Sequence, residues 1–202
     1  MGLTTPLVLR ALYQPKEVCA QLVAEDSPPI LALFRYPLLL MLLPPLFAFV
    51  GATLFGWRLG AAEPLYLDLT SRIVVSFAYF LAICFGFVTS VVISMWMAST
   101  YGANRSAEAH IALLTVVSAP LALASVIHLY PHVFINVLVL IPAISWSMAL
   151  LYRTLPTVLD IPPERGMLMA SSIVAWLLVG AVSLLGMTAI LWSLGIGTNV
   201  RI

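Results

Sequence analysis

Charged residues are scarce in this chain. Lys, Arg, Asp and Glu together make up 8% of its 202 residues, whereas a typical soluble domain has about 25%. The mean hydropathy is +1.09, and 62% of the residues are hydrophobic. A soluble fold of this length cannot bury so much apolar surface. We therefore expect an integral membrane protein, with the lipid bilayer as its main surroundings.

The chain also has few cysteines and little net charge. The two cysteines, Cys19 and Cys84, lie far apart, and their spacing indicates neither a disulfide framework nor a metal site. The formal net charge is +1, which gives no reason to expect a nucleic acid as a partner. The sequence therefore gives no sign of a disulfide-rich or metal-binding protein, or of a nucleic-acid-binding protein. The apolar segments are the next features to consider.

Two local pairs of titratable residues are weak candidates for chemistry. His128 and His132 are four residues apart, but Pro131 disfavours a continuous helix between them, and no third ligand is near in sequence. Glu108 and His110 are two residues apart, so they do not share a helix face. No nucleophile elbow, phosphate loop or metal signature is present. The sequence therefore predicts no enzymatic activity, no metal and no cofactor.

Long apolar runs are what the sequence does contain. A membrane core of about 30 Å takes about 20 helical residues to cross. The runs are continuous and lack the alternation of a barrel, so helices are expected. We predict an all-α polytopic membrane protein, with a five-span transmembrane domain at residues 35–202. The predicted spans lie at about 36–57, 73–99, 108–128, 132–152 and 167–195.

Residues 1–34 are predicted to form short amphipathic helices on the cytoplasmic surface. Pro6 and Pro15 each suit the first position of a helix. The second of these helices has one apolar face, which suits packing on the membrane surface or against the bundle. The residues of that face are Val18, Cys19, Leu22 and Val23.

The distribution of Lys and Arg predicts the orientation. With five spans, the N-terminal region shares one side of the membrane with the second and fourth connections. That side has six basic residues: Arg10, Lys16, Arg35, Arg105, Arg153 and Arg165. The other side has three: Arg58, Arg72 and Arg201. Basic residues are enriched on the cytoplasmic side of membrane proteins, so we expect a cytoplasmic N-terminus and an external C-terminus.

Small residues recur every four positions along the second span. In a helix, this spacing draws one slowly drifting stripe that allows close approach of a neighbouring helix. Packing within the bundle is the simpler interpretation, and a homodimer face is the alternative. The stripe consists of Ala78, Ala82, Gly86, Ser90, Ser94 and Ala98.

The interiors of the spans contain prolines and a few polar residues but no central charge. Because a charge at that depth usually marks an ion path, its absence argues against a proton-coupled pump. Prolines at 44, 45, 120 and 142 nevertheless favour a second hypothesis, a small transporter or carrier for a lipid or apolar solute. That hypothesis expects a water-filled cavity lined by residues from the set Ser90, Ser94, Asn136 and Ser145.

The stretch "LYRTLPTVLDIPPERG", from Leu151 to Gly166, is unusually polar for this chain. Its apolar residues predict a half-helix on the membrane surface, and Pro162 and Pro163 predict a turn before the last span. The stretch is either a plain connector or a docking site for a cytoplasmic partner. The residues expected to contact such a partner are Arg153, Asp160, Glu164 and Arg165.

Several local features, taken in order, resemble the Yip-type membrane family, in particular its bacterial inner-membrane branch. "LYQPKEV" (12–18) resembles the segment before the family's first span, and "AEAH" (107–110) with Pro120 resembles its third span. "LYP" (129–131) resembles the turn that follows, and the stretch 151–166 resembles the family's fourth connection. None of these features is catalytic.

The resemblance implies residence in the bacterial cytoplasmic membrane, but it carries over no activity and no site residue. Eukaryotic members are tied to vesicle traffic and bind Rab-type GTPases or sister proteins, and bacteria have no Rab system. The function expected is that of a non-enzymatic integral membrane scaffold or interaction protein. Its expected partner is another membrane protein or a second copy of the chain.

Overall fold

The prediction of an all-α fold is confirmed. A computed structural model describes residues 7–24, 35–58 and 63–193. The fold is 86% helical, and these residues contain no β-strand. In chain order the elements are α1 (Leu7–Tyr13), α2 (Pro15–Ala24), α4 (Arg35–Leu54), α5 (Leu69–Tyr101), α6 (Ala107–Ala124), the 3₁₀ helix η1 (Ser125–Leu129), α7 (Val133–Val158) and α8 (Pro163–Ser193).

Five segments are long and apolar enough to cross a membrane, as predicted. They are α4, α5, α6 together with η1, α7 and α8. The longest, α5, has 33 residues and is about 50 Å long. This length exceeds the roughly 30 Å membrane core, so α5 must tilt or extend beyond it.

Local side-chain and backbone signals set both ends of α5. Asp68 is its N-cap, and the Asp68 carboxylate accepts a hydrogen bond from the backbone N–H of Ser71 at 3.0 Å. The Ser71 side chain, and then its backbone N–H, lower the pKa of Asp68 below its usual value. Gly102 ends the helix in the left-handed conformation, with φ of 80°, which favours glycine.

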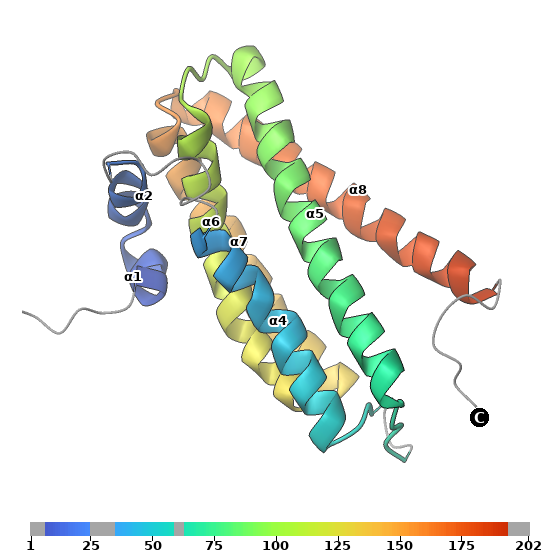
Figure 1. The fold of residues 1–202 in the computed structure, drawn as a ribbon. Coiled ribbons are helices and arrows are strands. Elements are labelled where there is room, and N and C mark those ends of the chain that lie inside the picture. The colour runs from blue at the N-terminus through green and yellow to red at the C-terminus, as the bar shows by residue number, and fades with distance from the viewer. Residues whose placement is uncertain (1–6, 25–34, 59–62, 194–202) are drawn as a thin grey trace, which may run out of the picture.

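The central helix of the bundle is α6. In this span 61% of the residues of the most apolar window are buried, against 11–39% in the other four. It contacts α4, α5 and α7, and α1 and α2 pack on it as well (Figure 1). The other spans are lipid-facing over much of their surfaces, because an apolar side chain loses nothing by facing lipid.

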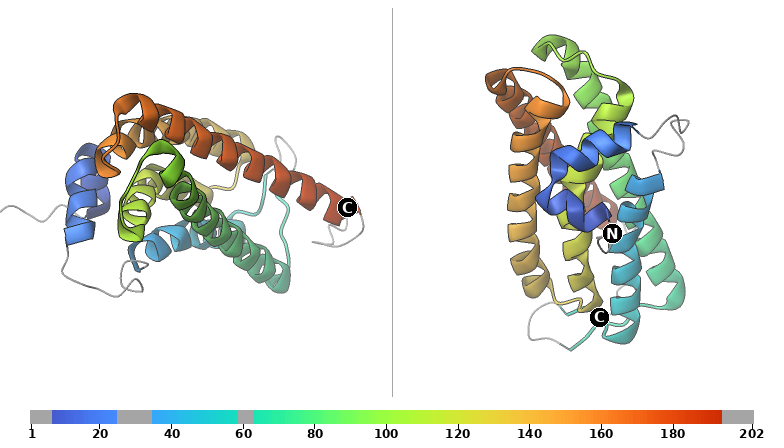
Figure 2. Two further views of the ribbon diagram at one scale, coloured as in Figure 1. Left: turned by 90° about the horizontal axis from the view of Figure 1, so that it is seen from above. Right: turned by 90° about the vertical axis from the view of Figure 1, so that its left-hand side faces the viewer.

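The N-terminal helices α1 and α2 lie against the bundle rather than apart from it (Figure 2). Pro15 begins α2 as predicted, and Pro6 is outside the described residues. Of the predicted apolar face, Val18, Cys19 and Leu22 are buried against α6 and α4, while Val23 is exposed. The structure therefore favours packing on the bundle over packing on the membrane surface.

The prediction of a separate surface half-helix after the fourth span is wrong. The helix α7 continues without interruption to Val158, through Pro156. Leu155 and Leu159 are fully buried in a cluster with residues of α5, α6 and α8, which stabilises these last turns. The expected turn follows, and α8 begins at Pro163.

The helices α5 and α8 meet near one end and diverge toward the other (Figures 1 and 2). Near the meeting point, the hydroxyl groups of Tyr101 and Ser172 are 3.0 Å apart and hydrogen-bonded. Farther along α8, apolar side chains such as Leu178 and Val182 are exposed. This part of α8 therefore presents apolar side chains to the surroundings.

Candidate functional site

Polar side chains gather at the two ends of the bundle. One end, here called the loop end, consists of residues 102–106, residues 153–166 and the adjacent helix α2. The other end, here called the pocket end, consists of residues 55–58, 63–68 and 125–132. The two ends differ in the contacts that their charged residues make.

The loop end contains the four residues predicted to contact a partner. All four (Arg153, Asp160, Glu164 and Arg165) are exposed. Asp160 forms a salt bridge with Arg105 at 3.0 Å, which ties the α7–α8 turn to the α5–α6 loop. The Nη1 atom of Arg165 lies close to Gly102, at 3.0 Å from where a Cβ atom would be. Asp160 has a φ of 56° and stands between buried neighbours, so it projects outward from a fixed turn.

A groove of about 550 Å³ opens at Arg105, the salt-bridge partner of Asp160, although none of the four residues lines it. Its walls come from α2, the α5–α6 loop, the start of α6 and the end of α7. Lys16 and Arg105 are its charged residues, and no acidic residue lines it. The groove therefore presents positive charge above an apolar floor.

Cys19 lies on the α2 side of this groove but is not a reactive thiol. Its side chain is buried, and burial raises its pKa to about 12. A thiol with a raised pKa stays protonated near neutral pH, and the thiolate is the nucleophilic form. Cys19 therefore serves packing in this structure.

The small-residue stripe of α5 is in contact along only half of its length. Ser90, Ser94 and Ala98 are buried, whereas Ala78 is exposed and Ala82 is half-buried. At Gly86 an added Cβ atom would meet nothing within 4 Å. The half of the stripe nearer the loop end packs in the bundle, and the other half is exposed or half-buried in a single copy.

One polar contact joins α5 to the central helix. The Ser94 hydroxyl and Nδ1 of His110 are hydrogen-bonded at 2.8 Å, and both side chains are buried. Ser90, one turn earlier, instead donates to the Gly86 carbonyl of its own helix at 2.6 Å. Glu108, the suggested partner of His110, is not bonded to it.

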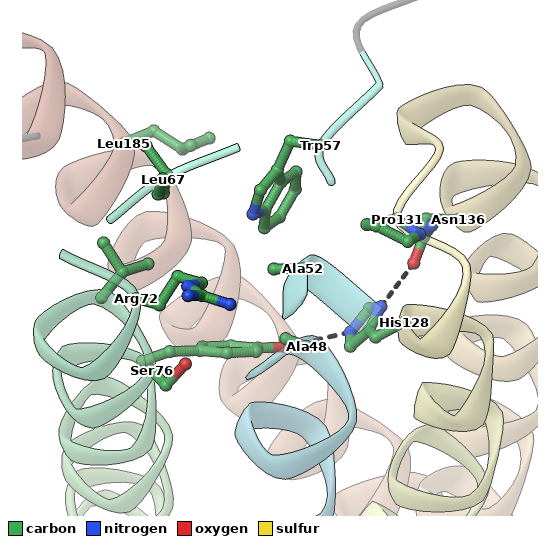
Figure 3. Close-up of a pocket in the computed structure, with 12 residues that line it drawn as sticks. Ala48, Ala52, Trp57, Leu67, Arg72, Ser76, His128, Pro131, Asn136 and Leu185 are labelled. Atoms are coloured by element: carbon green, nitrogen blue, oxygen red, sulfur yellow. Dashed lines mark hydrogen bonds between the residues drawn. The ribbon is translucent and has the colours of Figure 1, made fainter. Parts of the chain in front are cut away.

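At the pocket end, Tyr79, His128 and Asn136 form a hydrogen-bond network between α5, η1 and α7 (Figure 3). The Asn136 Nδ2 group donates to the carbonyls of Tyr130 and His132, both at 2.9 Å. The Asn136 Oδ1 atom therefore faces His128 and accepts from Nδ1, which leaves His128 Nε2 to accept from the Tyr79 hydroxyl at 3.3 Å. Both nitrogens of His128 are occupied, so neither is left to activate a serine.

This network forms one wall of a pocket of about 520 Å³. Arg72, Ser76 and Tyr79 line it from one face of α5, because they are spaced four and three residues apart. Trp57 lies across from them, and its backbone pairs with Leu65 at 2.8 Å in both directions. In Figure 3 the Arg72 side chain points into the pocket, between Trp57 and the α5 wall.

The polar residues suggested for a carrier do not come together. Ser90 and Ser94 lie in the packed part of α5, and Ser145 is exposed and donates to the Ile141 carbonyl of its own helix. Only Asn136 lines the pocket, from the first turn of α7 rather than from mid-span. Among the described residues, no group of three or more His, Cys, Asp or Glu side chains is placed to hold a metal.

Comparison with known proteins decides the family. The family model described as the Yip1 domain matches residues 9–197, almost the whole chain. The chain belongs to the Yip1 domain family. This confirms the family resemblance seen in the sequence. The Yip1 domain match includes α2 and every span, so the helices packed on α6 belong to the same unit.

Relatives of this Yip1 domain protein are found in Escherichia coli. The chain is 29% identical over 161 residues to "Inner membrane protein YohC" of strain K12, covering 80% of this chain and 83% of the relative. The protein of the same name from E. coli O6:H1 (strain CFT073) gives the same values. No solved structure matches the chain. The protein is a Yip1 family membrane protein similar to inner membrane proteins.

Proposed function

We propose that this protein is a non-enzymatic scaffold of the bacterial inner membrane that docks a partner at its loop end. The observation that carries the proposal is the basic groove at the loop end, where the lining residue Arg105 pairs with the exposed Asp160; Arg153, Glu164 and Arg165 are exposed at the same end. Its residues are held in place by the Arg105–Asp160 salt bridge and by the buried ends of α7. A fixed, charged and exposed surface is what recognition of a partner requires.

The interior of the bundle supports a scaffold over a carrier. Ser94 is bonded to His110, and Ser90 is bonded within its own helix, so these serines line no path across the membrane. The core cluster at the loop end of α5, α6, α7 and α8 is apolar. A packed centre fixes the relative positions of the surface residues, as a docking platform needs.

The charge of the groove favours an acidic partner segment. Lys16 and Arg105 line the groove without an acidic neighbour in its walls, and Arg105 is partly neutralised by Asp160. Charge complementarity of this kind governs the choice and rate of association more than raw affinity. With the orientation predicted from Lys and Arg counts, the loop end faces the cytoplasm. The partner is then a protein with an acidic cytoplasmic segment.

The test is co-purification from native membranes in mild detergent, followed by mass spectrometry of the bound proteins. Wild type should retain a stoichiometric protein partner, and Arg153→Glu or Arg165→Glu should lose it, because reversal places like charges opposite each other. Both residues are exposed, so the free energy of unfolding should change by less than about 0.5 kcal/mol.

Glu63→Lys is the matched control, since it reverses one exposed charge at the pocket end. This variant should retain the partner. Unchanged co-purification in both arginine variants would contradict docking at the loop end. Recovery of a bound small molecule without any protein partner would instead favour the carrier.

A second copy of the chain is the other partner that the structure suggests. The part of the α5 stripe at Ala78, Ala82 and Gly86 is exposed or half-buried in one copy, and small residues allow close helix contact. Co-expression of two differently tagged copies in the same experiment detects this form. Mutual co-purification that survives Arg153→Glu would assign the contact to α5 rather than to the loop end.

A further inference from the structure

The pocket at the pocket end contains a cation that lacks a counter-ion. The Arg72 side chain is half-buried, and its Nε atom is buried without a hydrogen-bond partner in the part of the chain that the structure describes, as is the Nε atom of Arg58 outside the pocket. The salt bridges found among those residues are Arg10–Glu17 and Arg105–Asp160, so Arg72 belongs to neither. Asp68, one turn earlier, is exposed and bonded to the Ser71 N–H. Removing a cation from water without a partner is costly, so an anion from outside would complete the site.

The remaining walls of the pocket are largely apolar. Ala48 and Ala52 of α4 leave space beside Val75 of α5, and Leu67 and Leu185 close the far side. The volume of about 520 Å³ is within the range of about 300–1,000 Å³ that small-molecule sites occupy. A free inorganic anion would neutralise Arg72 but leave these walls without apolar contacts. The pocket therefore matches a ligand that has both an anionic group and an apolar chain.

The location of the pocket indicates where such a ligand comes from. Arg72 lies in the first turn of a span, and Trp57 and Tyr79 line the same pocket, as aromatic residues do at the membrane–water interface. Leu185 lines the pocket, yet its side chain is 71% exposed. The pocket is therefore open on the side where α8 has diverged from α5, and that side faces the surrounding lipid.

We propose that this pocket binds one anionic membrane lipid. The headgroup phosphate pairs with the Arg72 guanidinium and accepts a hydrogen bond from the Ser76 hydroxyl, and an acyl chain lies along Val75 and Leu185. Tyr79 is hydrogen-bonded to His128, which Asn136 holds in turn, so the Tyr79 side chain is a fixed part of the pocket wall. His128 and Asn136 are positioning residues here. This proposal concerns the pocket end and stands independently of docking at the loop end.

The experiment measures lipid retention by the purified full-length chain in detergent, with native mass spectrometry. Three probes are added at equal concentration: phosphatidylglycerol, phosphatidylcholine and inorganic phosphate. We expect phosphatidylglycerol to bind about tenfold more tightly than phosphatidylcholine, because the latter adds a cation beside Arg72. Inorganic phosphate should neither bind detectably nor raise the melting temperature.

Variants locate the binding in the pocket. Arg72→Gln should weaken binding of phosphatidylglycerol by about tenfold or more, since it removes a charged hydrogen-bond donor. Arg72→Lys should restore most of it. Arg58→Gln is the control, because Arg58 also has a buried Nε atom without a partner among the described residues, but it does not line the pocket. Binding that falls equally in Arg58→Gln and Arg72→Gln would show general surface attraction and overturn the proposal.

A second pair of variants tests the apolar walls of the pocket and leaves Arg72 unchanged. Ala48→Leu fills the pocket from α4 and should reduce binding of phosphatidylglycerol, while Ala149→Leu on the exposed face of α7 should not. Unfolding curves of the lipid-free variants identify any that fail to fold. The proposal is wrong if Ala48→Leu folds and binds like wild type, if both lipids bind equally, or if inorganic phosphate competes with phosphatidylglycerol at equal concentration.

Discussion

Ser90 and Ser94 of α5 are similarly buried but form different hydrogen bonds, and this difference predicts their contributions to stability. Ser94 bonds to His110 of another helix, so Ser94→Ala leaves a buried ring nitrogen without a partner. We expect a loss of about 1–3 kcal/mol in the free energy of unfolding, measured by denaturant titration in mixed micelles. Ser90→Ala removes only a bond to a carbonyl of its own helix and should change stability by less than about 0.5 kcal/mol. Equal losses in the two variants would contradict this assignment.

Single residues were predictable from the sequence where the signal was local. Pro15 and Pro163 begin helices, and Glu164 lies in the first turn of α8, as the helix-start rules indicate. The Tyr79–His128 contact was not predictable, because 49 residues separate the two side chains and neither has a motif around it. Arg72 was counted only as a flanking charge, since hydropathy does not report which way a side chain points.

At the scale of elements, α4 and η1 approach each other closely at Gly51. A Cβ atom at this position would collide with the backbone carbonyl of His128 and lie 2.8 Å from that of Leu129. Backbone cannot move aside as a side-chain tip can, so Gly51→Ala should destabilise the protein by about 1–3 kcal/mol or more. Thermal unfolding in detergent measures the loss. Because His128 would shift, phosphatidylglycerol binding should weaken as well.

Gly180→Ala in α8 is the control for this substitution. At Gly180 an added Cβ atom meets nothing within 4 Å, and alanine favours the helix over glycine by up to about 1 kcal/mol. The control should be neutral or slightly stabilising. A Gly51→Ala variant that melts at the same temperature as this control would show that α4 and η1 are not closely packed.

The positions of the helices could be predicted from the sequence more readily than the contacts between them. Continuous apolar runs identify spans because every backbone group in lipid must bond within its own helix. They do not identify neighbours, since lipid and protein are equally apolar surroundings for a leucine. The extension of α7 through Pro156 was missed for this reason, as burial of Leu155 and Leu159 outweighs the local effect of the proline.

At the scale of the whole molecule, the two proposed functions lie at opposite ends: partner docking at the loop end and lipid binding at the pocket end. The loop end has its basic groove and a rigid turn, and the pocket end has Arg72 and an opening toward lipid. The central helix α6 contacts elements at both ends, so the packed core holds them at a fixed separation. The protein docked at one end and the lipid bound at the other would then face opposite sides of the membrane.

Cysteine labelling tests which side each end faces. Six basic residues on the loop-end side against three on the other predict a cytoplasmic loop end. A membrane-impermeant maleimide should therefore label Glu63→Cys in intact cells, and Glu164→Cys only after permeabilisation, because both positions are exposed at opposite ends. The native Cys19 contributes little background: with a pKa of about 12, only about one thiol in ten thousand is ionised at pH 8, and raising the pH to 9 still leaves the thiol protonated. Labelling of Glu164→Cys in intact cells would reverse the orientation and place the lipid pocket in the cytoplasmic leaflet.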